Sequence, residues 1–460
     1  MFNIYRLLFI VLIAVWISVF HTSCAVMVPP NGGPKDSIPP VLQLATPALN
    51  TLDFNTNKIV LNFDEYVEIK AIQDNLIVSP LPKINPIIDY KLKTVTIKLK
   101  DTLLPNTTYS LNFGNGLVDI NEGNALKGFN YIFSTGKYID SNRISGNVIL
   151  AETGAYDSTL IAVLHSNLND TAVLKTKPVY MAKIDGKGDF HFEHLPNKKF
   201  NLFVMPNDYA KRYDDSTKMF AFADSSIQSS SNPVSVKLFA YEEAKKKEKK
   251  VLPKPDKKKL TYTNSLDNYR QDLLNKSLTL TFSNKLKQGD STKVKLVDTS
   301  FRTIETALVT IDTALSRIII SNKWYPSDTL KLIVDKSAAT DTFGHTIDKT
   351  DTIKFVVNRN EDYGSLKIRF KNLDLSKNPV ILFFNNDILV ESRPIVQKEL
   401  FYKLFHPGEY DVRILFDDNK NGIWDPGNYK TRKQPERVQK FKNRIPVKAN
   451  WENEAELEIN

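Results

Sequence analysis

Cysteine is almost absent from this sequence, since Cys24 is the only one in 460 residues. No disulfide can therefore form within the chain, and its stability has to come from packed hydrophobic cores. The composition allows such cores, because 42% of the residues are hydrophobic and 25% are charged, which are ordinary values for globular proteins. A chain of this length predicts three or four domains of about 100 to 150 residues each.

Motifs that carry catalysis are also missing. No glycine-rich phosphate loop follows a strand and opens a helix, and no Gly-x-Ser-x-Gly nucleophile elbow occurs. The six histidines are scattered, and the three-residue spacing of His191 and His194 places them on opposite faces of a strand. The sequence gives no argument for an enzyme, for an organic cofactor or for a histidine metal site.

An excess of positive charge is confined to one short stretch. The formal net charge is +10, but residues 242–259 contain nine Lys against three Glu and one Asp. This lysine-rich run, which Pro253 and Pro255 interrupt, is typical of a solvated linker. Because the rest of the chain is only weakly basic, we expect no nucleic-acid partner.

Long helical periodicity is lacking as well, and a period of two takes its place. Alternation of this kind is the mark of half-buried strands, with successive side chains on opposite faces of a sheet. We therefore predict an all-β protein of tandem Ig-like or transthyretin-like antiparallel β-sandwiches. The alternation is clearest at Ile59, Leu61 and Phe63 and at Val95, Ile97 and Leu99.

The one long apolar run stands at the beginning of the chain, from Leu7 to Phe20, and follows the positive side chain of Arg6. These fourteen residues make a helix of roughly 21 Å, too short for a hydrocarbon core of about 30 Å. The pattern indicates a secretory signal. Cys24 follows and resembles the lipobox cysteine of bacterial lipoproteins, which receives the lipid and becomes the new N-terminus, although His21 stands where that family usually has Leu. The alternative is an uncleaved signal anchor with an incidental buried cysteine.

A tether is predicted next, because residues 25–40 contain five Pro and two Gly, which exclude a regular element. The Gly-Gly-Pro-Lys-Asp stretch at 32–36, ending at Pro39-Pro40, resembles the tether of a lipoprotein family common in the Bacteroidetes. That resemblance implies an Ig-like domain of the S-layer (SbsA) type directly after the tether. Residues 103–109 resemble the tyrosine corner of Ig-like sandwiches, in which the Tyr109 hydroxyl ties down the turn that enters a strand.

A second kind of sandwich is indicated from residue 141. Residues 188–196, which end in Leu-Pro, and the strand-like residues 200–204 resemble the carboxypeptidase regulatory-like (transthyretin-like) module. In that module a strand pair is joined through such a Leu-Pro turn. The resemblance implies a small sandwich without an active site.

Both kinds of module recur beyond the lysine-rich run. Tyr109 matches Leu330 at an offset of 221, and Phe190 matches Leu400 at an offset of 210 that stays constant through the strands that follow. We therefore predict two pairs of sandwiches. The predicted segments are a signal peptide at 1–23, lipidated Cys24 with its tether at 24–40, an SbsA-type Ig-like domain at 41–137, a regulatory-like sandwich at 141–240, the lysine-rich linker at 241–259, a second Ig-like sandwich at 260–357 and a second regulatory-like sandwich at 364–460.

One local motif, at residues 417–428, resembles an EF-hand calcium loop. Oxygen ligands stand at alternating positions and Gly422 allows the sharp turn, but position 12 is Asn428 instead of a bidentate Glu. The alternative is a tight Asn-Gly turn closed by Asx hydrogen bonds, with Trp424 packed beneath it. The candidate calcium ligands are Asp417, Asn419, Asn421, Asp425 and the carbonyl of Ile423.

Together these features predict a non-catalytic, lipid-anchored protein of the cell envelope with a structural or interaction role. We expect an outer-membrane lipoprotein, on the periplasmic face or at the cell surface. Its expected partners are the membrane, through the N-terminal lipid, and an envelope protein or a glycan. The alternative is a glycan- or peptide-binding surface lipoprotein, which an exposed aromatic platform on a loop face would favour.

Overall fold

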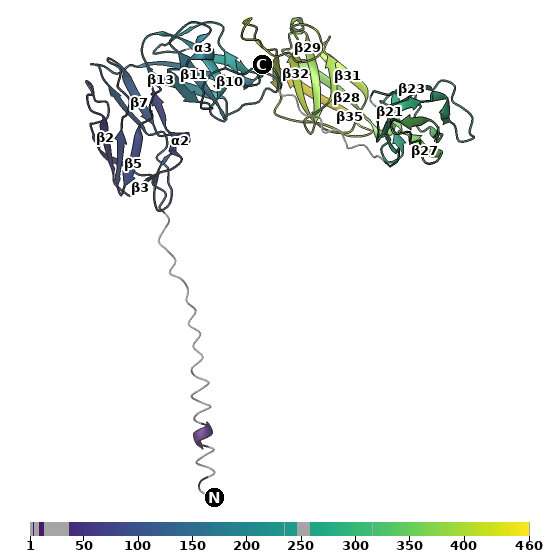
Figure 1. The fold of residues 1–460 in the computed structure, drawn as a ribbon, viewed down its shortest axis with the longest axis horizontal. Coiled ribbons are helices and arrows are strands. Elements are labelled where there is room, and N and C mark those ends of the chain that lie inside the picture. Colours follow the sequence, from purple (N-terminus) through teal and green to yellow (C-terminus); the bar gives the residue numbers. More distant parts are fainter. Residues whose placement is uncertain are drawn as a thin grey trace. The chain divides into compact units, whose positions relative to one another are not determined.

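The computed structural model describes residue 3 and residues 9–12, 36–233, 235–245, 258–314 and 316–459. Cys24, its tether up to residue 35 and most of the predicted signal and lysine-rich linker lie outside the described residues. The described chain is all-β, as predicted, and its helical segments are short (Figure 1). No helix in these ranges has the length and apolar character needed to cross a membrane. From residue 36 on, the helical turns are α2 (Ile72–Asn75), α3 (Ala172–Lys175), η1 (Ser291–Lys293), η2 (Asn360–Asp362) and η3 (Leu375–Lys377).

Two compact units make up the chain, residues 1–139 and residues 140–460. In the first unit, alternate side chains of the strands turn inward, so that Ile59, Leu61 and Val95 are fully buried. They pack with Leu111 and Phe133 from a second sheet in one hydrophobic core. The sheets have the orders β1 (Leu42–Thr46)-β2 (Lys58–Phe63)-β6 (Thr94–Lys98)-β5 (Ile87–Lys91), β4 (Ile77–Ser79)-β7 (Thr108–Asn112)-β9 (Asn130–Ser134) and β3 (Val67–Ile69)-β8 (Leu117–Asp119).

The predicted tyrosine corner is confirmed. The Tyr109 hydroxyl accepts a hydrogen bond from the backbone N–H of Leu104 at 2.7 Å. Its ring stacks on that of Phe133 with the centroids 5.2 Å apart. The same side chain thus fixes the turn before β7 and contributes to the core between the sheets.

A buried carboxylate closes the turn after β8. Asp119 is 1% exposed and accepts hydrogen bonds from the backbone N–H groups of Glu122, Gly123 and Asn124. Burial opposes the ionisation of this carboxyl group, but the N–H donors prevail and lower its pKa. The amide of Asn124 donates in turn to the carbonyl of Asp36, which holds the first described residues of the tether against this turn.

The second unit begins with a sandwich of residues 142–240. One sheet contains a parallel pair of strands, β10 and β17. The other has β11 and β14 at its centre, and every side chain of β11 is buried. The sheets have the orders β13 (Asp189–Leu195)-β10 (Asn142–Leu150)-β17 (Val236–Ala240) and β12 (Tyr180–Lys183)-β11 (Leu160–His165)-β14 (Lys199–Pro206)-β15 (Ala221–Phe222), with β16 (Ile227–Gln228) also paired to β14.

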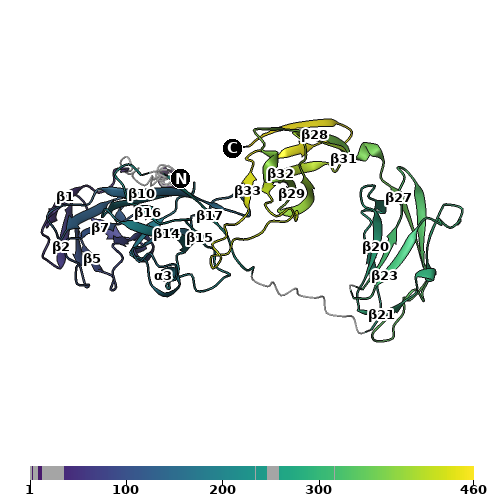
Figure 2. The ribbon, with the colours of Figure 1, turned by 90° about the horizontal axis from the view of Figure 1, so that it is seen from above.

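Residues 262–357 repeat the topology of the first unit. Figure 2 shows their two main layers, with β20 and β23 in one and β27 in the other. The sheets have the orders β18 (Tyr262–Asn264)-β20 (Ser277–Phe282)-β24 (Arg317–Ser321)-β23 (Leu308–Asp312), β19 (Arg270–Gln271)-β27 (Asp351–Val357)-β25 (Thr329–Val334)-β22 (Val294–Val297) and β21 (Leu286–Gly289)-β26 (Ala339–Asp341).

Residues 364–458 repeat the second topology strand for strand, including the parallel pair, here β28 and β35. The sheets have the orders β31 (Glu399–Phe405)-β28 (Gly364–Lys371)-β35 (Glu452–Glu458) and β30 (Ile388–Pro394)-β29 (Pro379–Asn385)-β32 (Gly408–Phe416)-β33 (Arg437–Lys440), with β34 (Ile445–Val447) also paired to β32.

Strand register confirms the internal repeat. Tyr109 lies opposite Phe133, and its predicted equivalent Leu330 lies opposite Phe355. Strand β13 starts at residue 189 and β31 starts at residue 399, at the predicted offset of 210. The tyrosine corner itself is not repeated, because an apolar Leu330 takes the place of the tyrosine.

Each of the four segments has a hydrophobic core of its own, with the buried residues lying within 54–133, 144–240, 260–357 and 366–459. A further cluster joins aromatic residues of the second segment to Tyr429 of the fourth. The boundary of the two compact units falls between residues 139 and 140, so the predicted boundaries inside the second unit stay a proposal.

A buried histidine generates a testable pH dependence. His165 at the end of β11 is 2% exposed, and desolvation lowers its pKa to about 4. In the unfolded chain this histidine has a pKa near 6.5, so between about pH 6.5 and 4 it is protonated when the chain is unfolded and neutral when the chain is folded. The free energy of unfolding should therefore fall as the pH drops through this range, by up to roughly 3 kcal/mol. The urea midpoint at a series of pH values measures this. His165→Phe should flatten the fall, whereas replacing the exposed His191 by Gln should not.

Candidate functional site

The predicted calcium loop lies between β32 and β33, at one end of the fourth segment. It begins at Asp417, whose side chain is 2% exposed although aspartate is usually found at the surface. One carboxylate oxygen accepts the N–H of Asn421 at 3.2 Å and the other accepts the N–H of Gly422 at 2.7 Å. Asp417 therefore points into the loop and closes it as an Asx-type turn.

Two asparagines converge on Asp425. The amide of Asn421 donates to the Asp425 carboxylate at 2.7 Å, and the amide of Asn419 donates to the same oxygen. The side-chain oxygen of Asn421 accepts the N–H of Ile423 at 2.8 Å. The side chains of three predicted ligand residues, Asn419, Asn421 and Asp425, thus meet in one cluster. Asp417 is joined to it through the backbone N–H of Asn421, and Ile423 through its own N–H.

This arrangement fits calcium only after a local rearrangement. The carboxylate oxygens of Asp417 and Asp425 already accept N–H groups, and Asn419 presents its amide nitrogen to Asp425. An ion would need that amide to turn its oxygen inward. Among the described residues no group of three or more His, Cys, Asp or Glu side chains is placed to hold a metal ion. The geometry matches the turn alternative, and calcium stays a prediction.

Glu436, which no motif or periodicity of the sequence indicates, holds the two ends of the loop together. It is 2% exposed, and its carboxylate accepts the N–H of Asp418 and the N–H of Asp425, each at 2.9 Å. Desolvation raises the pKa of this carboxyl group, with a smaller contribution from the charge of Asp417. The indole N–H of Trp424 donates to the backbone carbonyl of Glu436 at 2.7 Å, which places Trp424 beneath the loop as the turn alternative expects.

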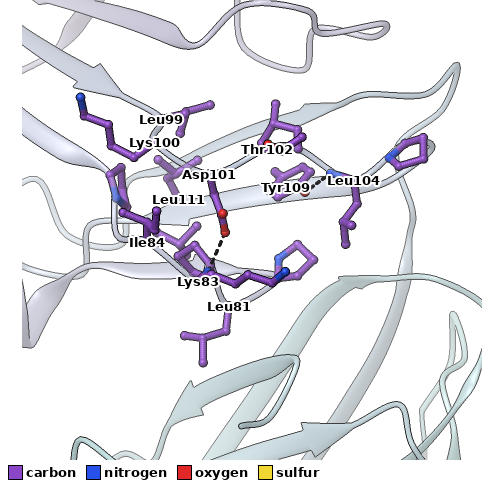
Figure 3. Close-up of a pocket in the computed structure, with 16 residues that line it drawn as sticks. Leu81, Lys83, Ile84, Leu99, Lys100, Asp101, Thr102, Leu104, Tyr109 and Leu111 are labelled. Carbon is purple, nitrogen blue, oxygen red and sulfur yellow. Dashed lines mark hydrogen bonds between the residues drawn. The ribbon is translucent and has the colours of Figure 1, made fainter. Parts of the chain in front are cut away.

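A separate groove lies in the first unit, between the segments 80–86 and 99–105 (Figure 3). Its volume is about 420 Å³ and its walls are mostly prolines and leucines, with Tyr109 and Leu111 among the lining residues. The carboxylate of Asp101 accepts the N–H of Lys83 at 2.6 Å and ties the two segments together. Ile84 is 57% exposed, so apolar surface is open to a ligand here.

An exposed aromatic platform would favour the glycan- or peptide-binding alternative. In the described residues the tryptophans do not stack into such a platform. Trp324 is buried in the core of the third segment and Trp424 is partly buried, while Trp451 is exposed with Lys448 over its ring. The predicted lipid attachment site, Cys24, lies outside the described residues.

Calcium titration separates a metal site from a turn. If the loop binds calcium, the ion at a hundred times its Kd would stabilise the folded chain by about 2.7 kcal/mol and raise its melting temperature by several degrees. Asp417→Ala should erase that gain, while alanine at the exposed, adjacent Asp418 should preserve it. If melting is indifferent to millimolar calcium, the turn is the better account. In either case Gly422→Val should destabilise, because φ at Gly422 is +78° and a β-branched residue resists this conformation.

Comparison with known proteins bears on the first unit. Three solved structures show low similarity. The major pilin subunit BcpA of Bacillus cereus is 11% identical, and the match covers 69% of this chain and 98% of that chain with a TM-score of 0.16. The TIE protein of Bacillus anthracis is 10% identical, and the match covers 94% of this chain and 76% of that chain with a TM-score of 0.18. Domains 1–6 of the surface layer protein SbsC are 11% identical, and the match covers 82% of this chain and 65% of that chain with a TM-score of 0.16. TM-scores this low mean that the whole chains do not superpose, so these structures say nothing about what this protein binds or builds. No curated protein matches the chain. Residues 36–135 match the family model of the bacterial Ig-like domain, which confirms the predicted Ig-like domain in this part of the chain.

Proposed function

We propose that this protein is a lipid-anchored component of the cell envelope with a structural or interaction role. The observation that carries the proposal is the order of features along the chain. A signal-like apolar run ends at Cys24, a Pro- and Gly-rich tether follows, and residues 36–135 then match a bacterial Ig-like domain. A lipid at Cys24 would attach this domain and everything after it to a membrane surface.

A non-catalytic role is supported by what the buried carboxylates do. Asp119, Asp341 and Asp417 are at most 2% exposed, and each accepts backbone N–H groups of its own turn. The lone pairs of these groups are thus used to close loops, so they are poor candidates for acid–base chemistry. The proposed location is the outer membrane, at its periplasmic face or at the cell surface, and the proposed partner beyond the membrane is an envelope protein or a glycan.

A binding role is the second candidate, and the groove of Figure 3 favours it. Apolar walls with a few polar groups are typical of small ligand sites, and Lys83 and Lys100 stand among the lining residues. A glycan- or peptide-binding surface lipoprotein would use this groove. If so, soluble peptidoglycan fragments should bind the chain, and Ile84→Ser should weaken binding about tenfold. Serine at the exposed Leu44, which does not line the groove, is the matched control. Calorimetry that detects no binding to the unaltered chain would remove this candidate.

The anchor is tested by substitution of the thiol. Cys24→Ser should abolish metabolic labelling with a radioactive fatty acid and move the protein out of the membrane fraction, because each buried methylene contributes about 0.8 kcal/mol to membrane binding. Met27→Ser, three residues further on, should be labelled like the unaltered protein. Label that persists on the Cys24→Ser variant would contradict lipidation at this position. Protease treatment of intact cells then distinguishes the two faces of the outer membrane.

A further inference from the structure

An aromatic contact joins the two regulatory-like sandwiches across a long stretch of sequence. The ring of Tyr429 is 4% exposed and lies edge-on to rings of the second segment. Its centroid is 5.2 Å from those of Phe220 and Phe222 and 5.8 Å from that of Phe203. We name residues 427–434 the docking loop. The aromatic cluster that receives it consists of Phe203, Tyr213, Phe220, Phe222 and Tyr241.

Directional hydrogen bonds surround this contact. The Tyr429 hydroxyl donates to the carbonyl of Asp170 at 2.8 Å. The guanidinium of Arg432 donates to the carbonyl of Asp224 at 2.9 Å and lies 4.9 Å above the ring of Phe222. An aromatic anchor with a polar rim is the usual anatomy of a stable protein–protein interface.

Charge complementarity reinforces the rim. The docking loop carries three basic residues and no acidic residue, and it meets carboxylates of the second segment. Arg432 forms an ion pair with Asp170 at 3.5 Å. The amides of Asn428 and Gln434 donate to the carboxylates of Glu243 at 2.8 Å and Asp224 at 2.7 Å.

The two backbones also approach closely. The N–H of Val438 donates to the carbonyl of Ala151 at 3.0 Å. A Cβ added at Gly427 would lie 2.7 Å from the ring of Tyr241, and one added at Gly154 would lie 2.8 Å from the backbone nitrogen of Lys440. Glycine is therefore required on both sides of the contact, which is a mark of tight packing.

The duplicated modules are not interchangeable at this interface. At the offset of 210, Arg413 is the equivalent of Phe203 of the aromatic cluster. Its guanidinium makes a cation–π contact with Phe384, 4.0 Å from the ring centroid. The fourth segment lacks this part of the aromatic cluster, so a second docking loop would meet a charged side chain there. The contact therefore pairs one loop with one cluster and does not favour extension into a filament.

From these contacts we propose that the docking loop and the aromatic cluster form a self-sufficient joint. The joint holds segments 142–245 and 364–459 together without the covalent path between them. The second Ig-like sandwich and the lysine-rich run are then an insertion between two halves of one body. The occupant of the aromatic cluster is the docking loop of the same chain, and this proposal does not depend on the lipid anchor.

Cleavage of the lysine-rich run tests the joint. A site for a sequence-specific protease is placed at residues 250–253 in the chain that starts at residue 25. After cleavage, native mass spectrometry and size-exclusion chromatography at micromolar concentration should show the two fragments as a one-to-one complex. Separation of the unaltered fragments would overturn the proposal. An uncut chain that elutes as a dimer and becomes monomeric with Tyr429→Ala would overturn it as well, since the docking loop would then occupy the cluster of a second copy.

Substitutions identify the contact. Tyr429→Ala should weaken the association of the cleaved fragments about 100-fold, and Arg432→Ala should do so to a smaller extent. Tyr209→Ala is the matched control, because that ring is 91% exposed and lies in the second segment, and its fragments should stay together. If Tyr429→Ala disturbs folding, Gln434→Ala removes two hydrogen bonds to the second segment while leaving the aromatic contact in place. Fragments that associate equally in all variants would contradict the assignment of the joint to this loop.

Discussion

Burial of one tyrosine ring among aromatic side chains is the interaction that turns separate sandwiches into a larger body. Tyr429 comes from the fourth segment and its neighbours come from the second, which precedes it by about two hundred residues. Without disulfides, the chain can join distant segments only through such packed surfaces. The aromatic cluster would expose a large apolar patch if Tyr429 were withdrawn, and such patches are rare on soluble monomers.

The candidate calcium loop has a structural role at the same interface. Asp417 closes the turn, Glu436 joins its ends, and the docking loop lies between these two carboxylates in the sequence. The turn therefore presents the docking loop to the second segment. Either a bare turn or a calcium-bound one can serve this purpose. In both cases the polar residues at 417–425 position an interface, with no need for any role in catalysis.

Local patterns made much of the fold predictable. The period of two predicted the strands that bury Ile59 and Leu61. Residues 103–109 predicted the hydrogen bond to the Tyr109 hydroxyl, because a tyrosine corner is a contact between residues near in sequence. The offsets of 221 and 210 likewise predicted the duplicated topology, since equivalent residues keep equivalent registers. These features follow from spacing along the chain, and spacing is what a sequence displays.

The interface could not be predicted in this way. Glu436 is eleven residues beyond Asp425 and no periodicity links them, so its place in the loop depends on how β33 folds back. The sequence around Tyr429 is typical of a turn, and the sequence around Phe220 and Phe222 is typical of strands in the second segment. Their meeting depends on tertiary packing between segments that have no shared pattern.

Hydrogen exchange at the Val438 amide tests the joint between the segments most directly. Strand β33 pairs with β32 on one side, and the N–H of Val438 points across to Ala151 of the other segment at 3.0 Å. If the segments form one body, this amide should exchange as slowly as amides of the fourth segment's own core strands, and Tyr429→Ala should accelerate it alone. An amide at Val438 that exchanges as fast as those of exposed loops in the unaltered chain would contradict the account.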